Sequence, residues 1–124
     1  MTAPRSRILV VDDNLTNLKL VTFLLSQGPY DVRAAVDADD ALELIRSFKP
    51  RLVLIDMQLT DVDGMTLARR LRADPAARDS LIVAVSTQAM MEEEKARALG
   101  VDGYISKPLE PDRFRRAVAS YLVG

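Results

Sequence analysis

Residues 52–64 have the sequence LVLIDMQLTDVDG, and the first four of them form an apolar run that does not alternate with polar residues. A strand that is buried on both faces of a parallel sheet has this pattern, because helices cover both sides of such a sheet. Asp56 follows the run directly, and Gly64 stands where a new helix would begin. This stretch predicts a buried parallel strand that leads into a carboxylate.

Similar apolar runs occupy residues 8–11 and 81–85, and weaker ones occupy residues 32–35 and 103–106. Apolar residues at helical spacing fill the intervals, and they begin near Leu15, Ala41, Met65, Glu93 and Phe114. Turn and helix-end residues separate the segments: Gly28, Pro29, Pro50, Gly100 and Pro111. The order is a strand followed by a helix, five times. It predicts right-handed crossovers and a doubly wound, three-layer α/β sandwich with a five-stranded parallel sheet.

The composition limits what this chain can do. Its 124 residues, 48% of them hydrophobic, suit one domain over residues 1–124 with a core at about 7–122. Lys and Arg number 17 against 18 Asp and Glu, so no strong field attracts nucleic acid or anionic lipid. No apolar run is long enough for a signal peptide or a membrane span, so we expect a cytoplasmic protein. Without cysteine or histidine, the chemistry depends on carboxylates, hydroxyls and lysine.

Polar residues follow the predicted strands: Asp12 and Asp13 after the first, Asp56 after the third, Ser86 after the fourth and Lys107 after the fifth. Ligands bind at the carboxyl edge of open α/β sheets, so we expect these side chains to converge there. Three carboxylates in one cleft repel each other unless a proton or a hard cation balances their charge. Oxygen ligands favour Mg²⁺.

Each of these residues also has an ordinary structural interpretation. Asp12 and Asp13 could cap a helix, Ser86 could close a strand, and Lys107 with Pro108 could form a turn. In the functional interpretation, this turn can contain a cis bond and directs the lysine toward the cleft. Taken together, they favour phosphoryl transfer to Asp56. A cation and the Lys107 ammonium would offset the repulsion between an anionic donor and the anionic nucleophile.

The segments ILVVDDN, LVLIDMQLTDVDG, IVAVS and GYISKP resemble, in order and spacing, the signature segments of bacterial response-regulator receiver domains. The resemblance covers essentially the whole chain. It implies a flavodoxin-like sheet with strand order 2-1-3-4-5, which places the loop of Asp12 and Asp13 beside Asp56. The protein is then expected to be a stand-alone receiver of the chemotaxis-regulator kind, and not a turnover enzyme.

The resemblance also implies a role for each residue. Asp56 would be the phosphoacceptor, while Lys107 and Ser86 would contact the phosphoryl oxygens. Ser86 and Tyr104 would form the conformational switch. The Mg²⁺ ligands would be Asp13 and Asp56 directly, Asp12 through water, and Gln58 through its backbone carbonyl. The implied partners are a sensor histidine kinase or histidine phosphotransfer protein, and an effector that binds the face of the fourth helix, fifth strand and fifth helix.

Two positions depart from the family pattern: Thr60, where many relatives carry proline, and Thr87, where alanine or glycine is usual. Neither removes a required group, so we expect them to affect rates and not the chemistry. Two alternative functions would require a different set of residues. A magnesium-dependent phosphatase would require an Asp-x-Asp pair and a cap domain. A degenerate receiver that only binds a partner would have lost one of the five polar groups, and all five are present.

Overall fold

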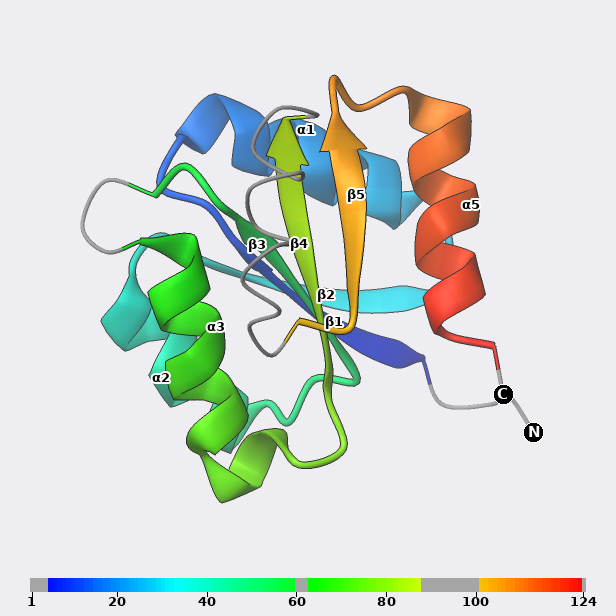
Figure 1. Cartoon of the computed structure of the whole chain (residues 1–124). Coiled ribbons are helices and arrows are strands. Elements are labelled where there is room, and N and C mark those ends of the chain that lie inside the picture. The colour runs from blue at the N-terminus through cyan, green and yellow to red at the C-terminus, as the bar shows by residue number, and fades with distance from the viewer. Residues whose placement is uncertain (1–4, 60–62, 88–100, 124) are drawn as a thin grey trace.

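The computed structural model describes residues 5–59, 63–87 and 101–123. Within these ranges five parallel strands form one sheet in the order β2-β1-β3-β4-β5, as expected (Figure 1). The strands are β1 (Ser6–Val11), β2 (Tyr30–Ala35), β3 (Leu52–Asp56), β4 (Leu81–Thr87) and β5 (Gly103–Lys107). The helices are α1 (Leu15–Ser26), α2 (Ala38–Ser47), α3 (Gly64–Ala73), the 3₁₀ helix η1 (Pro75–Ala77) and α5 (Pro111–Tyr121).

The expected helix through Glu93, Ala96 and Leu99 lies outside the described residues, as does Thr60. Three strands extend further at their carboxyl ends than the sequence pattern predicted. Asp56 is the last residue of β3, Ser86 lies inside β4, and Lys107 is the last residue of β5. These residues are still paired in the sheet, with Asp56 beside Val85 and Ser86 beside Ser106. These polar side chains therefore belong to the last paired residues of the strands, and the backbone hydrogen bonds of the sheet fix their positions.

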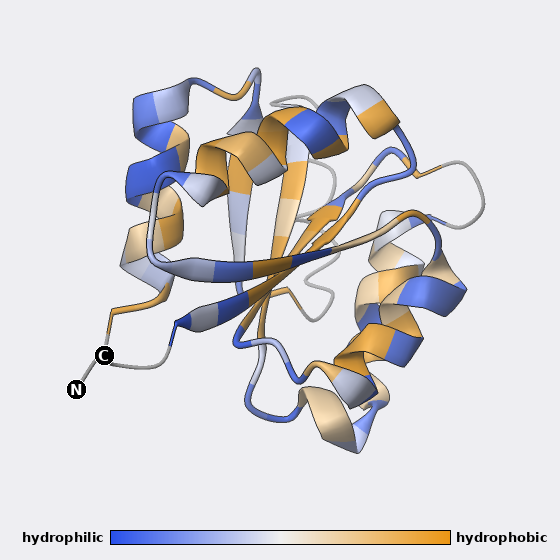
Figure 2. Ribbon diagram, turned by 180° about the vertical axis from the view of Figure 1, so that it is seen from behind, coloured by the Kyte–Doolittle hydropathy of each residue, from blue (hydrophilic) through white to orange (hydrophobic). Residues whose placement is uncertain are grey.

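Helices cover both faces of the sheet, which makes the fold a three-layer sandwich. Side chains of α2 and α3 share one core cluster with Leu9, Val53 and Ile82, whereas α1 and α5 share the other with Ile8 and Leu54. Apolar residues concentrate in the strands and on the inner sides of the helices (Figure 2). All five residues of β3 are buried, which confirms the prediction from its non-alternating run.

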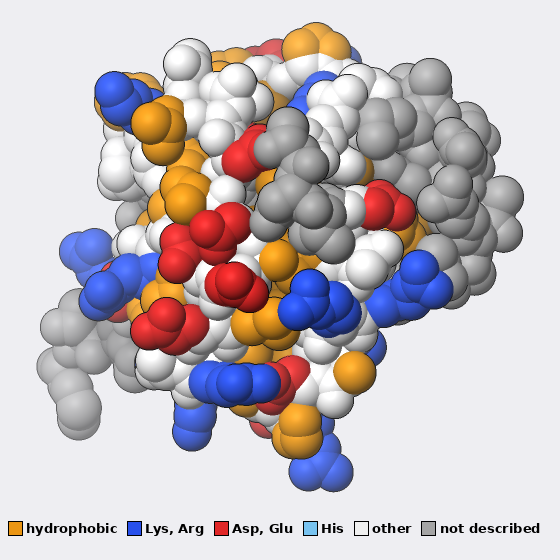
Figure 3. Space-filling model, turned by 90° about the vertical axis from the view of Figure 1, so that its left-hand side faces the viewer, with side chains coloured by type: hydrophobic (Ala, Val, Ile, Leu, Met, Phe, Trp, Pro, Cys, Tyr) orange, Lys and Arg blue, Asp and Glu red, His pale blue; other side chains and the backbone are white. Residues whose placement is uncertain are grey.

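Local signals set the helix ends that border the carboxyl edge of the sheet. The side chain of Asn14 caps α1 by accepting from the backbone N–H of Asn17 at 3.0 Å. Asp37 caps α2 in the same way, and Asp39 and Asp40 follow in its first turn, where the helix dipole favours negative charge. Acidic side chains gather on this side of the molecule (Figure 3).

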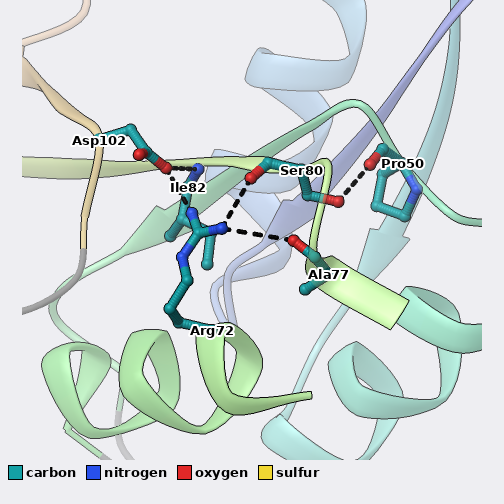
Figure 4. Close-up of polar contacts among 6 residues, drawn as sticks. All are labelled: Pro50, Arg72, Ala77, Ser80, Ile82 and Asp102. Atoms are coloured by element: carbon teal, nitrogen blue, oxygen red, sulfur yellow. Dashed lines mark hydrogen bonds and ion pairs between the residues drawn. The ribbon is translucent and has the colours of Figure 1, made fainter. Parts of the chain in front are cut away.

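At the opposite, amino edge of the sheet, Arg72 of α3 joins several segments (Figure 4). Its guanidinium donates to the carbonyls of Ala77 and Ser80, at 3.3 and 3.0 Å, and forms an ion pair with Asp102. Asp102 also accepts from the backbone N–H of Ile82 at 2.7 Å. Arg72 thus connects α3 to the starts of β4 and β5. No helix in the described part of the chain has the length and apolar character that a membrane crossing requires.

Candidate functional site

The sheet register brings the predicted polar residues to one edge. Val11 pairs with Ile55, so Asp12 and Asp56 are the next residues along two neighbouring strands. On the other side, Thr87 of β4 pairs with Lys107 of β5. The carboxyl ends of β1, β3, β4 and β5 therefore surround one site, as the sequence predicted.

Asp56 lies at the centre of this site, and its side chain is 6% exposed. Lys107 Nζ donates to Asp56 Oδ1 at 2.8 Å, and the backbone N–H of Gln58 donates to the same oxygen at 3.0 Å. Lys107 Nζ also contacts Gln58 Oε1 at 3.3 Å. The Lys107–Pro108 peptide bond is cis, one of the two forms considered for this turn. The lysine ammonium and the backbone N–H donor hold this buried carboxyl group in a fixed position.

Asp12 is the second buried carboxyl group of the site. Burial, followed by the charge of Asp56 and a side-chain hydrogen bond with it, raises the pKa of Asp12 to about 6. The backbone N–H of Asn14, at 2.9 Å from Asp12 Oδ1, and the charge of Lys107 act in the opposite direction. The site thus carries more negative charge than its own cation balances.

The side-chain atoms at this edge that could bind a metal are carboxylate oxygens, which suit a hard cation. Among the described residues, no cluster of three or more acidic, histidine or cysteine side chains could hold a metal ion. Mg²⁺, however, commonly binds through one or two carboxylates and keeps several waters. The pair of Asp12 and Asp56 satisfies this smaller requirement, and both carboxyl groups are buried at this edge. Asp13 lies half-buried in the same loop, and its direct ligand role stays a prediction.

Ser86 and Tyr104 lie on the same face of neighbouring strands. Tyr104 pairs with Ala84, two residues before Ser86, and both Ala84 and Tyr104 belong to the cluster on the α2 and α3 side. Because side chains alternate along a strand, Ser86 points to that side as well. Ser86 is fully buried, and Tyr104 is half-buried. The arrangement is compatible with the predicted switch pair, whose movement stays a prediction.

Two residues contribute to the site in ways that the sequence analysis did not predict. Asn14 caps α1 and also fixes the Asp12 carboxyl group through its backbone N–H. Its position after two aspartates and before a helical stripe is a capping signal that could have identified it. The side chain of Gln58 accepts from Lys107, whereas only its backbone carbonyl was predicted to take part. No local pattern indicates that contact.

Comparison with known proteins agrees with this geometry. The family model for the response regulator receiver domain matches residues 8–119. The polar-differentiation response regulator DivK of Brucella anthropi is 36% identical over 120 residues, which cover 96% of this chain and 97% of DivK. The chemotaxis response regulator CheY4 of Vibrio cholerae shares the fold, with a TM-score of 0.86 at 20% identity over 95% of this chain and 99% of CheY4.

A third similar structure is the receiver domain of a sensor histidine kinase from Pseudomonas aeruginosa, described with a magnesium ion coordinated in its active-site cleft. It has a TM-score of 0.83 at 24% identity and covers 94% of this chain and 97% of that domain. The fold and the edge of Asp12, Asp56 and Lys107 define a receiver of two-component signalling. The chain belongs to the response regulator receiver domain family.

Proposed function

We propose that this receiver accepts a phosphoryl group on Asp56 and passes the signal to a partner protein. The contact between Lys107 Nζ and Asp56 Oδ1, 2.8 Å long at the carboxyl edge, carries this proposal. A carboxylate oxygen of Asp56 attacks phosphorus, the bond from phosphorus to the donor breaks, and an acyl phosphate forms. The donor is a sensor histidine kinase or a histidine phosphotransfer protein, and the protein works in the cytoplasm.

The residues around Asp56 supply electrostatic stabilisation. Two anions approach each other in the reaction, so a positive charge at the acceptor lowers the barrier. Lys107 is already at the acceptor oxygen, and its ammonium can remain beside the charge that develops on the phosphoryl oxygens. Gln58 fixes the acceptor through its backbone N–H. The hydroxyl of Ser86 would donate a hydrogen bond to a phosphoryl oxygen.

Mg²⁺ is the cofactor that this proposal includes. Asp12 and Asp56, with Asp13 and the backbone carbonyl of Gln58, would hold it. When bound, the ion neutralises the carboxylates and the incoming phosphoryl oxygens. The position of Asp12 and Asp56 supports this assignment, because both carboxyl groups are buried and line the same cavity at the carboxyl edge.

Output would pass through Ser86 and Tyr104. Movement of Ser86 toward a phosphoryl group leaves space that Tyr104 can fill from the neighbouring strand. The face that includes β5 and α5 then changes and binds the effector. The protein is thus a switch that assists its own phosphorylation and dephosphorylation, and not a turnover enzyme.

One experiment tests the acceptor. The protein is incubated with acetyl phosphate and Mg²⁺, and the adduct is mapped by mass spectrometry. We expect one phosphoryl group on Asp56, and none on Asp56→Asn. Asp63→Asn is a matched control, because Asp63 is an exposed N-cap of α3. Labelling of Asp56→Asn at the wild-type level would refute the proposal.

A further inference from the structure

A small cavity of about 240 Å³ opens beside Asp56, between α1 and the loop after β5. Its floor consists of apolar strand residues, among them Val10, Leu54 and Val85. Leu20 of α1 and Leu109 form part of its walls. Pockets for drug-sized ligands are commonly about 300–1,000 Å³. This cavity is therefore too small for a nucleotide but large enough for a short organic group.

The lining of the cavity combines two kinds of side chain. Asp12, Asn17, Asp56 and Lys107 are its polar members, and the other lining residues are apolar. Leu20 is 45% exposed although it lines this cavity. A ligand that suits both kinds of lining has a phosphoryl group joined to a short apolar group.

We propose that this cavity binds the acyl chain of small-molecule acyl phosphates. As a direct phosphodonor, the receiver then prefers an acyl phosphate with a chain longer than acetyl, such as butyryl phosphate, to acetyl phosphate. The inference rests on the proposed phosphorylation of Asp56. In the reaction the bond between phosphorus and the acyl oxygen breaks, and a bond between phosphorus and an Asp56 oxygen forms. The carboxylate leaves with the electron pair of the broken bond.

The leaving group selects acyl phosphates over phosphate esters. An alcohol leaving group requires a proton from a general acid, and this chain contains no histidine to supply one. A carboxylate leaves as a stable anion and requires no proton. The ammonium of Lys107, which lies beside Asp56, can compensate the negative charge of the carboxylate as it departs.

The test compares acetyl phosphate with butyryl phosphate, whose leaving groups have nearly equal basicity. Second-order labelling rates of Asp56 are measured with Mg²⁺ by intact mass. Each fully buried methylene contributes roughly a fourfold preference. Because one wall is partly open, we expect butyryl phosphate to react at least about threefold faster.

Two exposed positions on α1 provide matched variants. Leu20→Ser removes an apolar wall, and we expect the ratio of butyryl to acetyl rates to fall by about half or more. Phe23→Ser changes a side chain that is 61% exposed and does not line the cavity, so the ratio should not change. A second measurement is an NMR titration of the wild type with butyl phosphonate and Mg²⁺, in which the methyl signals of Leu20 and Leu109 should shift.

The possible results separate the two proposals. If both donors label Asp56 at the same rate, or if Phe23→Ser lowers the ratio as much as Leu20→Ser does, the cavity does not bind the acyl chain and only this inference fails. If the methyl signals do not shift, the inference also fails. If neither donor labels Asp56, the proposed function fails as well.

Discussion

Lys107 Nζ reaches Asp56 Oδ1 across an intervening strand, because β4 lies between β5 and β3 in the sheet. Adjacent strands are about 4.8 Å apart, so the lysine side chain extends over the end of β4 to make a contact of 2.8 Å. Lys107 is the last residue of β5, and it pairs with Thr87. The end of the ladder thus directs the ammonium along the sheet edge toward the carboxylate.

Lys107→Met keeps much of the aliphatic length of the side chain and removes its charge. We expect labelling of Asp56 by acetyl phosphate to slow on the order of a hundredfold, because one electrostatic donor at the reacting group is lost. Arg115→Met is the control, since Arg115 pairs with Asp112 on α5 away from the site. Initial rates from intact mass would measure both. An equal rate in Lys107→Met and wild type would show that the ammonium does not assist transfer.

The raised pKa of Asp12 predicts that the stability of the metal-free protein depends on pH. Its folded pKa of about 6 lies above the ordinary value of 3.8 for an aspartate, so the folded state binds the proton more tightly than the unfolded state. The stability from this group is fully present below about pH 4 and is lost as the pH rises through 6. We expect the melting temperature in EDTA to decrease between pH 5 and 7.5, and to decrease less in Asp12→Asn.

Asp74 provides a control of opposite sign. The backbone N–H of Ala76, then the hydrogen bond from Arg46, lower the pKa of Asp74 below 3.8. Its stabilising effect is present above pH 3.8 and is lost as the pH falls through the lowered pKa. Asp74→Asn should therefore leave the decrease between pH 5 and 7.5 unchanged. The Asp12 assignment would be wrong if both variants altered that decrease equally.

Ser86→Ala tests the switch. The hydroxyl is not required to form the acyl phosphate, so the variant should still bind beryllofluoride at Asp56. A ligand shifts an equilibrium only by its differential affinity for the two states, and the variant lacks the hydroxyl that distinguishes them. We expect a reduced change in Tyr104 ring signals by NMR on adding beryllofluoride. A wild-type change would exclude Ser86 from the switch.

Thr87 pairs with Lys107 in the sheet register and is half-buried at the edge of the site. Its β-branched side chain is stiff at χ1 and cannot readily move aside for an in-line donor or water. Thr87→Ala should therefore accelerate both labelling by acetyl phosphate and loss of the phosphoryl group. Slower loss alone would show instead that the Thr87 hydroxyl orients the attacking water. Unchanged rates would mean that Thr87 faces away from the site.

Arg72→Met tests the network at the amino edge of the sheet. The variant removes the partner of the Ala77 and Ser80 carbonyls and of the Asp102 carboxylate, so we expect a loss of about 1–3 kcal/mol in the free energy of unfolding. Arg46→Met is the comparison. Arg46 is 67% exposed and pairs only with Asp74 among the described residues, so its removal should cost less than about 1 kcal/mol. Urea denaturation would measure both, and equal losses would contradict the assigned role of Arg72.

The sequence alone determined the fold and the edge of the sheet at which the polar residues lie. The apolar run at 52–55 predicted a fully buried strand, and β3 is buried throughout because helices lie on both of its faces. The polar residues after the runs predicted that Asp12, Asp56 and Lys107 lie together, and the contacts of Asp56 with the other two agree. Burial and strand direction leave local patterns in the chain, which is why the sequence shows both features. The roles of Asp13, Ser86 and Tyr104 stay predictions.

The tertiary structure alone decided how those side chains interact. Lys107 binds Asp56 and Gln58, and Asp12 has a raised pKa, and no local pattern in the sequence indicates either feature. The cavity that places Leu20 beside Asp56 also has no signal in the sequence. These features depend on distances between atoms on strands and helices far apart in the chain, and on how deeply each charge is buried. Only the packing of the whole sheet against its helices determines those quantities.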